Sequence, residues 1–164
     1  MKHLNLGGRF IGEGFPVFII AEIGSNHNLD KMVVKDLIDA ASETGFDAVK
    51  FQTYEPLDVF SGKITTKDVN YEALYGFRPW WEVARDNILM PREWFEEMFE
   101  YIRKKDMIAF STVHSTNDAE FIMQFKPPVF KVASIDVTYH EFLEGLSKFD
   151  IPIILSTGMS TLER

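Results

Sequence analysis

The stretch Val17-Phe-Ile-Ile-Ala-Glu-Ile-Gly-Ser-Asn-His-Asn28 is an apolar run that ends in a cluster of hydrogen-bonding groups. A continuous apolar run between Pro16 and Gly24 is typical of a parallel strand covered on both faces, so we predict a strand over 17–23. Glu22 is costly to bury there unless it has a function, and ligands of parallel α/β folds bind at the carboxyl ends of strands. Alternatively, Glu22 is a capping group and residues 24–28 form an ordinary turn.

The composition is that of one globular domain, with 164 residues, 46% hydrophobic and 26% charged. A net charge of −8 argues against a nucleic-acid or anionic-membrane surface. The absence of cysteine excludes a disulfide framework and thiolate chemistry. No apolar run approaches membrane-spanning length, so we expect a cytoplasmic protein without a nucleic-acid or membrane partner.

Strand and helix patterns alternate along the rest of the chain. The alternation implies parallel strands joined by right-handed crossovers, in either an open doubly wound sheet or the first part of an eightfold barrel. Because a barrel typically needs about 250 residues, we expect the chain to end before closure. The strands are predicted at 17–23, 47–53, 107–112, 129–135 and 153–157, and the helices at 30–45, 91–105, 117–125 and from 138 onward.

Three further local patterns carry expectations. Thr138 with Glu141, and Ser160 with Glu163, have the spacing of capping boxes, and the second pair predicts a helix that begins as the chain ends at Arg164. Residues 54–90 are too long and too aromatic for an ordinary connection, so we expect a functional loop that stacks on a sugar, closes as a lid, or packs over the barrel end.

Polar groups stand at or just beyond the carboxyl end of every predicted strand. Because these ends meet at one end of a parallel sheet or barrel, the groups are expected to converge. Lys50 and Gln52, two residues apart, share one face of their strand, as do Ser134 and Asp136. The full set is Glu22; Lys50 and Gln52; Ser111 and Thr112; Lys131, Ser134 and Asp136; and Ser156 and Thr157.

Two lysines accompanied by hydroxyl groups in an acidic protein suit a small anion such as a carboxylate or phosphate. A structural alternative pairs Lys50 and Lys131 with Glu22 or Asp136 in buried salt bridges. A second chemical alternative is a Schiff-base lysine, because a desolvated lysine beside another cation becomes nucleophilic.

Other candidate ligand groups are weaker. His27 and His114 stand at strand ends, but single histidines are more often hydrogen-bonded structural groups, and we predict no complete metal site within these residues. Backbone N–H groups between Gly158 and Ser160 could hold a phosphate.

Several strings of the sequence resemble the sialic acid synthase family, in the same order and spacing, from about Gly7 to the last residue. They are Phe18-Ile-Ile-Ala-Glu-Ile-Gly-Ser-Asn-His-Asn28, Ala48-Val-Lys-Phe-Gln-Thr-Tyr54, Phe110-Ser-Thr112, Phe130-Lys-Val-Ala-Ser134 and Pro152-Ile-Ile-Leu-Ser-Thr-Gly-Met159. The resemblance implies the N-terminal part of a (β/α)8 barrel, about five of eight strands, that condenses phosphoenolpyruvate with an N-acylated hexosamine to give a nonulosonic acid. It also implies a divalent metal, Mn²⁺ or Mg²⁺, and a homodimer when full length.

The resemblance also implies residue roles. Glu22 and Gln52 resemble residues that line the reacting centre, with Glu22 a candidate for proton transfer or for orienting the sugar aldehyde. Asp136 resembles a position that contacts the sugar. The phosphoenolpyruvate-binding set corresponds to Lys50, Thr112, Lys131, Ser134 and Ser156.

Three departures from the family pattern bear on these roles. The family carries a glutamate at the place of Asp136, and the Trp80-Trp81 region resembles pseudaminic acid synthases more than neuraminate synthases, so the hexosamine is left open. The family's two metal-binding histidines and its antifreeze-like domain would lie beyond Arg164. We therefore expect the isolated chain to lack activity and to self-associate; a non-catalytic fragment that binds phosphoenolpyruvate or a partner is the remaining alternative.

Overall fold

The five predicted strands form one parallel sheet in the computed structural model, which describes residues 3–161. Their spatial order, β3-β4-β5-β6-β7, follows the sequence, so each crossover places the next strand beside the last. Glu22 pairs with Lys50, Gln52 with Thr112, and Thr112 with Lys131 across the ladders. The strands are β3 Ile20–Glu22, β4 Ala48–Thr53, β5 Ile108–Val113, β6 Phe130–Val132 and β7 Ile153–Leu155.

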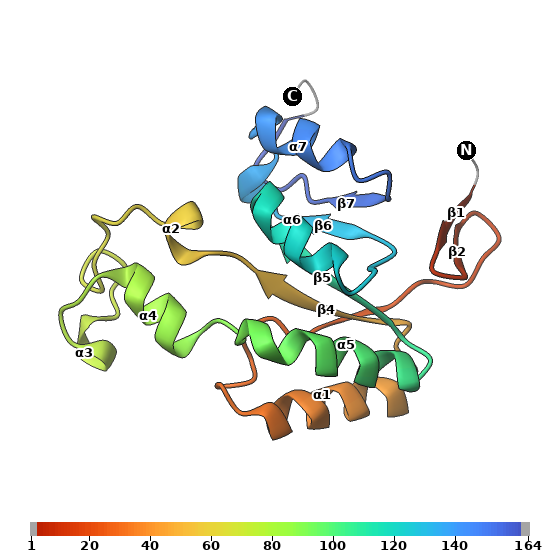
Figure 1. The fold of residues 1–164 in the computed structure, drawn as a ribbon, viewed down its shortest axis with the longest axis horizontal. Coiled ribbons are helices and arrows are strands. Elements are labelled where there is room, and N and C mark those ends of the chain that lie inside the picture. The colour runs from red at the N-terminus through yellow and green to blue at the C-terminus, as the bar shows by residue number, and fades with distance from the viewer. Residues whose placement is uncertain (1–2, 162–164) are drawn as a thin grey trace.

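The sheet curls, and its helices lie on the outer face, as in half of a (β/α)8 barrel (Figure 1). Helices α1 and α5 lie side by side below β4, and α6 and α7 lie next to each other towards the opposite edge of the sheet, where β6 and β7 are. The prediction of parallel barrel units is therefore confirmed, and the open doubly wound alternative is not the fold. The helices are α1 Lys31–Glu43, α5 Phe95–Lys104, α6 Thr116–Met123 and α7 His140–Ser147.

Side-chain caps set the start of two of these helices. Asp30 Oδ1 accepts a hydrogen bond from the Met32 N–H at 2.8 Å and caps α1, as predicted. Ser115 Oγ accepts from the Asp118 N–H at 3.1 Å and caps α6. Pro91 precedes a short 3₁₀ turn, η1 Arg92–Trp94, so α5 begins four residues later than predicted.

The predicted capping box before α7 was wrong. Tyr139 is the N-cap residue, and its side chain makes no capping hydrogen bond. At the end of the chain, Ser160 Oγ donates to the Thr157 carbonyl at 3.0 Å, and Glu163 lies outside the described residues.

A cluster of aromatic rings forms the centre of the hydrophobic core between the sheet and its helices. The rings of Phe51, on β4, and of Phe95 and Phe99, on α5, are buried with centroids 5.9 to 6.2 Å apart. Such pairs add about 0.5–1.5 kcal/mol each beyond area burial. This packing fixes α5 against β4, whose opposite face carries Lys50 and Gln52.

The amino-terminal residues form a hairpin that the sequence analysis missed, β1 His3–Leu6 with β2 Arg9–Gly12. Gly7 and Gly8 make the turn, both at positive φ, and the Asn5 side chain accepts from the Gly8 N–H at 2.8 Å. Leu6 is fully buried against the amino-terminal ends of β4 and β5 and against Val129. The hairpin thus lies at the end of the barrel opposite the predicted site (Figure 1).

Residues 54–90, which we call the excursion, contain three short helices where we expected a loop. A Thr65–Pro79 bridge and the stacked rings of Tyr71 and Trp80, 5.2 Å apart, hold it together. It projects from the carboxyl end of β4 (Figure 1). Its helices are α2 Pro56–Val59, α3 Glu72–Tyr75 and α4 Trp80–Asn87.

Three predicted strands were too long. The first, predicted over 17–23, pairs only over Ile20–Glu22, and Val17 is 82% exposed. The fourth and fifth pair over three residues each, because residues 134–136 turn into a 3₁₀ helix, η2 Ser134–Asp136, and the chain leaves the sheet after Leu155.

Candidate active site

Lys50 lies at the centre of the cluster at the carboxyl end of the sheet. Its ammonium group forms an ion pair with Glu22 on β3 and donates to Thr112 Oγ1 on β5 at 2.9 Å. Only 12% of the Lys50 side chain is exposed. Three neighbouring strands are thus joined by one cation, as expected from the alternation of side chains along β4.

Gln52 extends the cluster along the same face. Its Nε2 atom donates to Glu22 Oε1 at 3.2 Å. Gly24 lies against both groups: a Cβ atom there would stand 3.0 Å from Glu22 Oε1 and 3.2 Å from Gln52 Nε2. Gly24 also has φ +52°, so this position needs a glycine for two reasons. From the sequence pattern alone, Gly24 marks only the end of a strand and the start of a turn.

Glu22 is more open than predicted. Its side chain is 43% exposed, because β3 has a neighbouring strand on one side only among the described residues. The expected cost of burying Glu22 is therefore small in this structure, and its carboxylate is accessible to a ligand.

Lys131 forms the second cationic point. Its ammonium group donates to Ser156 Oγ at 2.6 Å and to the Val132 carbonyl at 2.5 Å, and no carboxylate pairs with it in the part of the chain that the structure describes. Burial, and then the positive charge of Lys50, lower the pKa of Lys131, while Glu22 and Asp136 oppose this shift. The salt-bridge alternative thus holds for Lys50 but not for Lys131.

Asp136 faces His114 rather than Lys131. The Asp136 Oδ2 and His114 Nδ1 atoms lie 2.8 Å apart, with both side chains nearly buried, but without the alignment of a good hydrogen bond. Burial lowers the pKa of His114, and Asp136 partly offsets this. Sequence reasoning considered His114 only as a possible metal ligand and missed this pair; no local pattern links the two residues.

Ser134 and Asp136 do not share a strand face, because both lie in the 3₁₀ turn η2 rather than in an extended strand. Ser134 instead lies beside Gly158, whose added Cβ would stand 3.7 Å from Ser134 Oγ. Ser134 therefore faces the segment that follows β7, close to the Ser156 end of the cluster.

Ser111, which we expected to converge with the other polar groups, and His27, a histidine at a predicted strand end, both lie away from the cluster. Ser111 points to the helix side of β5, where its Oγ atom is buried 2.7 Å from Thr53 Oγ1. His27 is fully buried beside Trp94, accepts from the Leu29 N–H at 3.0 Å through Nδ1, and leaves Nε2 without a partner among the described residues. Burial lowers the pKa of His27.

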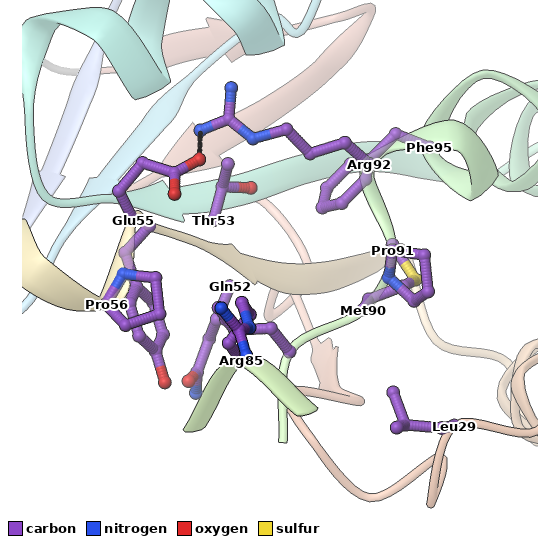
Figure 2. Close-up of a pocket in the computed structure, with 12 residues that line it drawn as sticks. Leu29, Gln52, Thr53, Glu55, Pro56, Arg85, Met90, Pro91, Arg92 and Phe95 are labelled. Carbon is purple, nitrogen blue, oxygen red and sulfur yellow. Dashed lines mark ion pairs between the residues drawn. The ribbon is translucent and has the colours of Figure 1, made fainter. Parts of the chain in front are cut away.

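A cavity of about 250 Å³ opens beside this cluster, between β4 and the excursion (Figure 2). Gln52 belongs to both the cavity wall and the Glu22 cluster. Arg92 crosses above it, with its guanidinium 2.9 Å from Glu55 Oε1 and 3.0 Å from Asp118 Oδ1. No local sequence pattern predicts this cavity, because the segments that line it are far apart in the chain.

Residues 37–164 match the NeuB family. The chain belongs to this family. Among relatives, the chain is 33% identical to the spore coat polysaccharide biosynthesis protein SpsE of Bacillus subtilis over 96% of its own length and 41% of SpsE. It is 31% identical to a pseudaminic acid synthase of Campylobacter jejuni, with 90% and 43% covered.

The solved structure of N-acetylneuraminic acid (sialic acid) synthetase from Leptospira borgpetersenii, in complex with citrate, superposes with a TM-score of 0.82 at 26% identity. The match covers 99% of this chain and 52% of that one. The chain thus spans less than half of the curated NeuB relatives described above and about half of this structure. The resemblance to sialic acid synthases predicted from the strand motifs is confirmed.

Within residues 3–161, no three His, Asp or Glu side chains come together closely enough to hold a metal ion. The same residues contain no helix with the length and apolarity needed to cross a bilayer.

Proposed function

We propose that this chain contributes the phosphoenolpyruvate-binding part of an enzyme that condenses phosphoenolpyruvate with an N-acylated hexosamine, giving a nonulosonic acid and phosphate. The observation that carries the proposal is the half-buried Lys131, which has no carboxylate partner among residues 3–161 and lies next to Lys50 at the carboxyl end of a parallel half-barrel. Membership in the NeuB family supports it, since relatives include pseudaminic and legionaminic acid synthases.

In this proposal the cations and hydroxyl groups hold the two anionic ends of phosphoenolpyruvate. The ammonium groups of Lys50 and Lys131 supply charge, and hydroxyl groups supply directed hydrogen bonds, which fix the geometry of an oxyanion. Glu22 pairs with Lys50, whereas Lys131 has no carboxylate at ion-pair distance among residues 3–161, so its charge is the one available to an anion. The hydroxyl groups are those of Thr112, Ser134 and Ser156.

The reaction forms one carbon–carbon bond. C3 of phosphoenolpyruvate attacks the aldehyde carbon of the open-chain sugar, and the aldehyde oxygen becomes a hydroxyl group of the product. Water adds at C2 and phosphate leaves, which generates the keto group of the new acid. The aldehyde oxygen must gain a proton in this step. Glu22, exposed and held by Lys50 and Gln52, is the group we assign to that proton transfer or to orienting the aldehyde.

Asp136 is assigned to the sugar, with His114 beside it. A divalent metal, Mn²⁺ or Mg²⁺, supplies Lewis acidity in the family that the sequence resembles. The described residues do not fit a complete site for it, so no step is assigned to the metal here. A cytoplasmic homodimer is the remaining part of the proposal, and sedimentation of the full-length gene product tests the dimer.

The test is turnover by the full-length gene product with phosphoenolpyruvate, Mn²⁺ or Mg²⁺, and a panel of N-acylated hexosamines headed by N-acetylmannosamine. We expect phosphate release that depends on the sugar, and a product whose mass equals the sugar plus the pyruvate unit. The polypeptide 1–164 alone should release no phosphate. Absence of product with every sugar would refute the proposal.

One observation favours a second candidate, a Schiff-base ketoacid aldolase. Burial and Lys50 lower the pKa of Lys131, which increases the fraction of neutral, nucleophilic amine. Borohydride reduction in the presence of pyruvate distinguishes the two functions. An aldolase would gain a covalent adduct on Lys131, whereas the synthase forms no imine and should remain unmodified.

A further inference from the structure

A second cavity, of about 380 Å³, lies at the amino-terminal end of the sheet, opposite the lysine cluster. We call it the amino-terminal cavity. Three connections form its walls: the turn of the β1–β2 hairpin, the residues that lead from α5 into β5, and those that lead from α6 into β6 (Figure 1). Because β5 pairs with β4 on one side and with β6 on the other, this cavity does not lie at an open edge of the sheet.

The rim of the amino-terminal cavity is cationic. Arg9, Arg103 and Lys126 line it, and Asp106 is the one carboxylate among its lining residues. Arg9 Nη2 donates to Asp106 Oδ2 at 3.2 Å, in an ion pair whose carboxylate is 99% exposed. Exposed pairs of this kind are weak, so Asp106 competes poorly with a ligand for Arg9. Three positive charges thus face one negative charge, in a chain whose net charge is −8.

Two of these cations have donors that are free to bind an anion. Arg103 Nη1 donates to the Phe125 carbonyl at 2.7 Å, and its other nitrogens have no partner among residues 3–161. Neither Arg103 nor Lys126 has a carboxylate at ion-pair distance within the same residues. In the cavity beside β4, by contrast, both arginines are paired with carboxylates. A planar guanidinium with free N–H groups suits the paired oxygens of a phosphate.

The floor of the amino-terminal cavity is apolar. Met107, Ile108 and Ala109 line it and are each at most 8% exposed, and Pro128 lies beside them. The hairpin turn packs directly on this floor, since a Cβ atom on Gly7 would stand 3.3 Å from Pro128 Cγ. An apolar floor with a few charged groups at the rim is typical of sites for organic ligands.

We propose that the amino-terminal cavity binds an organic phosphate that carries a flat apolar ring, the chemistry of a nucleoside phosphate. The phosphate lies against Arg103 and Lys126, Arg9 reaches it from the hairpin, and the ring covers the apolar floor. The volume of about 380 Å³ falls in the range of roughly 300–1,000 Å³ that is usual for organic ligands, and is more than a phosphate group fills.

This ligand and phosphoenolpyruvate can be bound at the same time. Ile108 at the floor and Thr112 in the lysine cluster stand four residues apart on β5, about 13 Å at about 3.3 Å per residue. Phosphoenolpyruvate has no ring to cover the apolar floor, so it binds far more weakly here than at Lys131. The inference does not depend on the proposed function, because no residue of the lysine cluster lines this cavity.

Isothermal titration of AMP, CMP, GMP and UMP into the full-length gene product tests the proposal. Saturating phosphoenolpyruvate is present at fixed ionic strength, so that the phosphate groups of the probes do not enter the lysine cluster. Inorganic phosphate is titrated in parallel as the probe without a ring. The variants are Arg103→Gln and Arg9→Gln. Lys104→Gln is the matched control, because Lys104 is an exposed cation next to Arg103 that does not line the cavity.

We expect at least one nucleotide to bind, and Arg103→Gln to raise its Kd about tenfold or more, as for the loss of a hydrogen bond between charged groups. Arg9→Gln should raise it about threefold or more, because Arg9 also bonds Asp106. Lys104→Gln and Lys131→Met should leave the Kd of the nucleotide within about twofold of wild type, and inorganic phosphate should bind at least about tenfold more weakly.

Three results would overturn the proposal. The first is no binding of any of the four nucleotides at about 5 mM, where a site with a millimolar Kd is mostly filled. The second is inorganic phosphate binding as tightly as the nucleotides, which removes the ring from the ligand. The third is wild-type binding by both arginine variants, which places the nucleotide elsewhere. If Arg103→Gln does not fold, Arg9→Gln decides, since its ion pair is exposed. Failure of the turnover assay would refute the proposed function and leave this titration unaffected.

Discussion

Replacing Lys131 by methionine should weaken phosphoenolpyruvate binding without unfolding the protein. Methionine keeps the length and apolar stem of the side chain but removes its charge. Lys131 is half-buried and has no carboxylate partner among residues 3–161, so the fold loses no ion pair. The loss of a hydrogen bond to a charged group is worth about 1.5–3 kcal/mol, which corresponds to a dissociation constant about 10- to 150-fold higher.

Isothermal titration of phosphoenolpyruvate into the full-length gene product measures this change at fixed ionic strength. Lys126→Met is the control, because Lys126 is exposed and lies before β6, at the other end of the barrel. We expect Lys126→Met to bind as the wild type does. A Lys131→Met protein that keeps its melting temperature and binds within about twofold of wild type would refute the assignment of Lys131 to the anion.

Three further predictions concern stability and positioning. Gly145→Ala should destabilise the chain by about 1–3 kcal/mol in urea unfolding, since its Cβ would overlap Thr116 Cγ2, and in a Thr116→Ser background it should stabilise by about 0.5–1 kcal/mol instead. Gly24→Ala should cost about 1–2 kcal/mol and lower kcat/KM about tenfold or more by displacing Glu22, measured by unfolding and kinetics. Burial lowers the pKa of His27, so neutral His27 contributes fully to stability above pH 6.5. Below pH 6.5 this contribution falls by at most about 1.4 kcal/mol per pH unit. His27→Asn should therefore flatten the dependence of the unfolding free energy on pH.

The parallel sheet and the lysine cluster could be predicted from sequence because both depend on short-range periodicity. Lys50 and Gln52 point the same way since side chains alternate along β4, and the carboxyl ends of neighbouring parallel strands lie at the same edge of the sheet. No knowledge of distant contacts is needed for either conclusion. The resemblance to sialic acid synthases rested on the same strand motifs.

Features that depend on distant contacts could not be predicted in this way. The exposure of Glu22 depends on which strand lies beside β3, and the His114–Asp136 pair depends on a 3₁₀ turn that ends the extended segment after Val132. The hairpin was missed because its four-residue strands are short and its glycines also suit a loop. The cavity requires the excursion to fold back onto β4, which no local pattern specifies.

The internal bonding of the excursion separates two kinds of evolutionary change. Its Thr65–Pro79 bridge, the Thr66 hydroxyl donating to the Gly76 carbonyl at 2.6 Å, and its stacked rings are all made within residues 54–90. Substitutions there can reshape the cavity wall while the strands that hold Lys50 and Lys131 stay in register. The shape of this cavity can therefore diverge among related sequences while the lysine cluster at the end of the sheet is inherited unchanged.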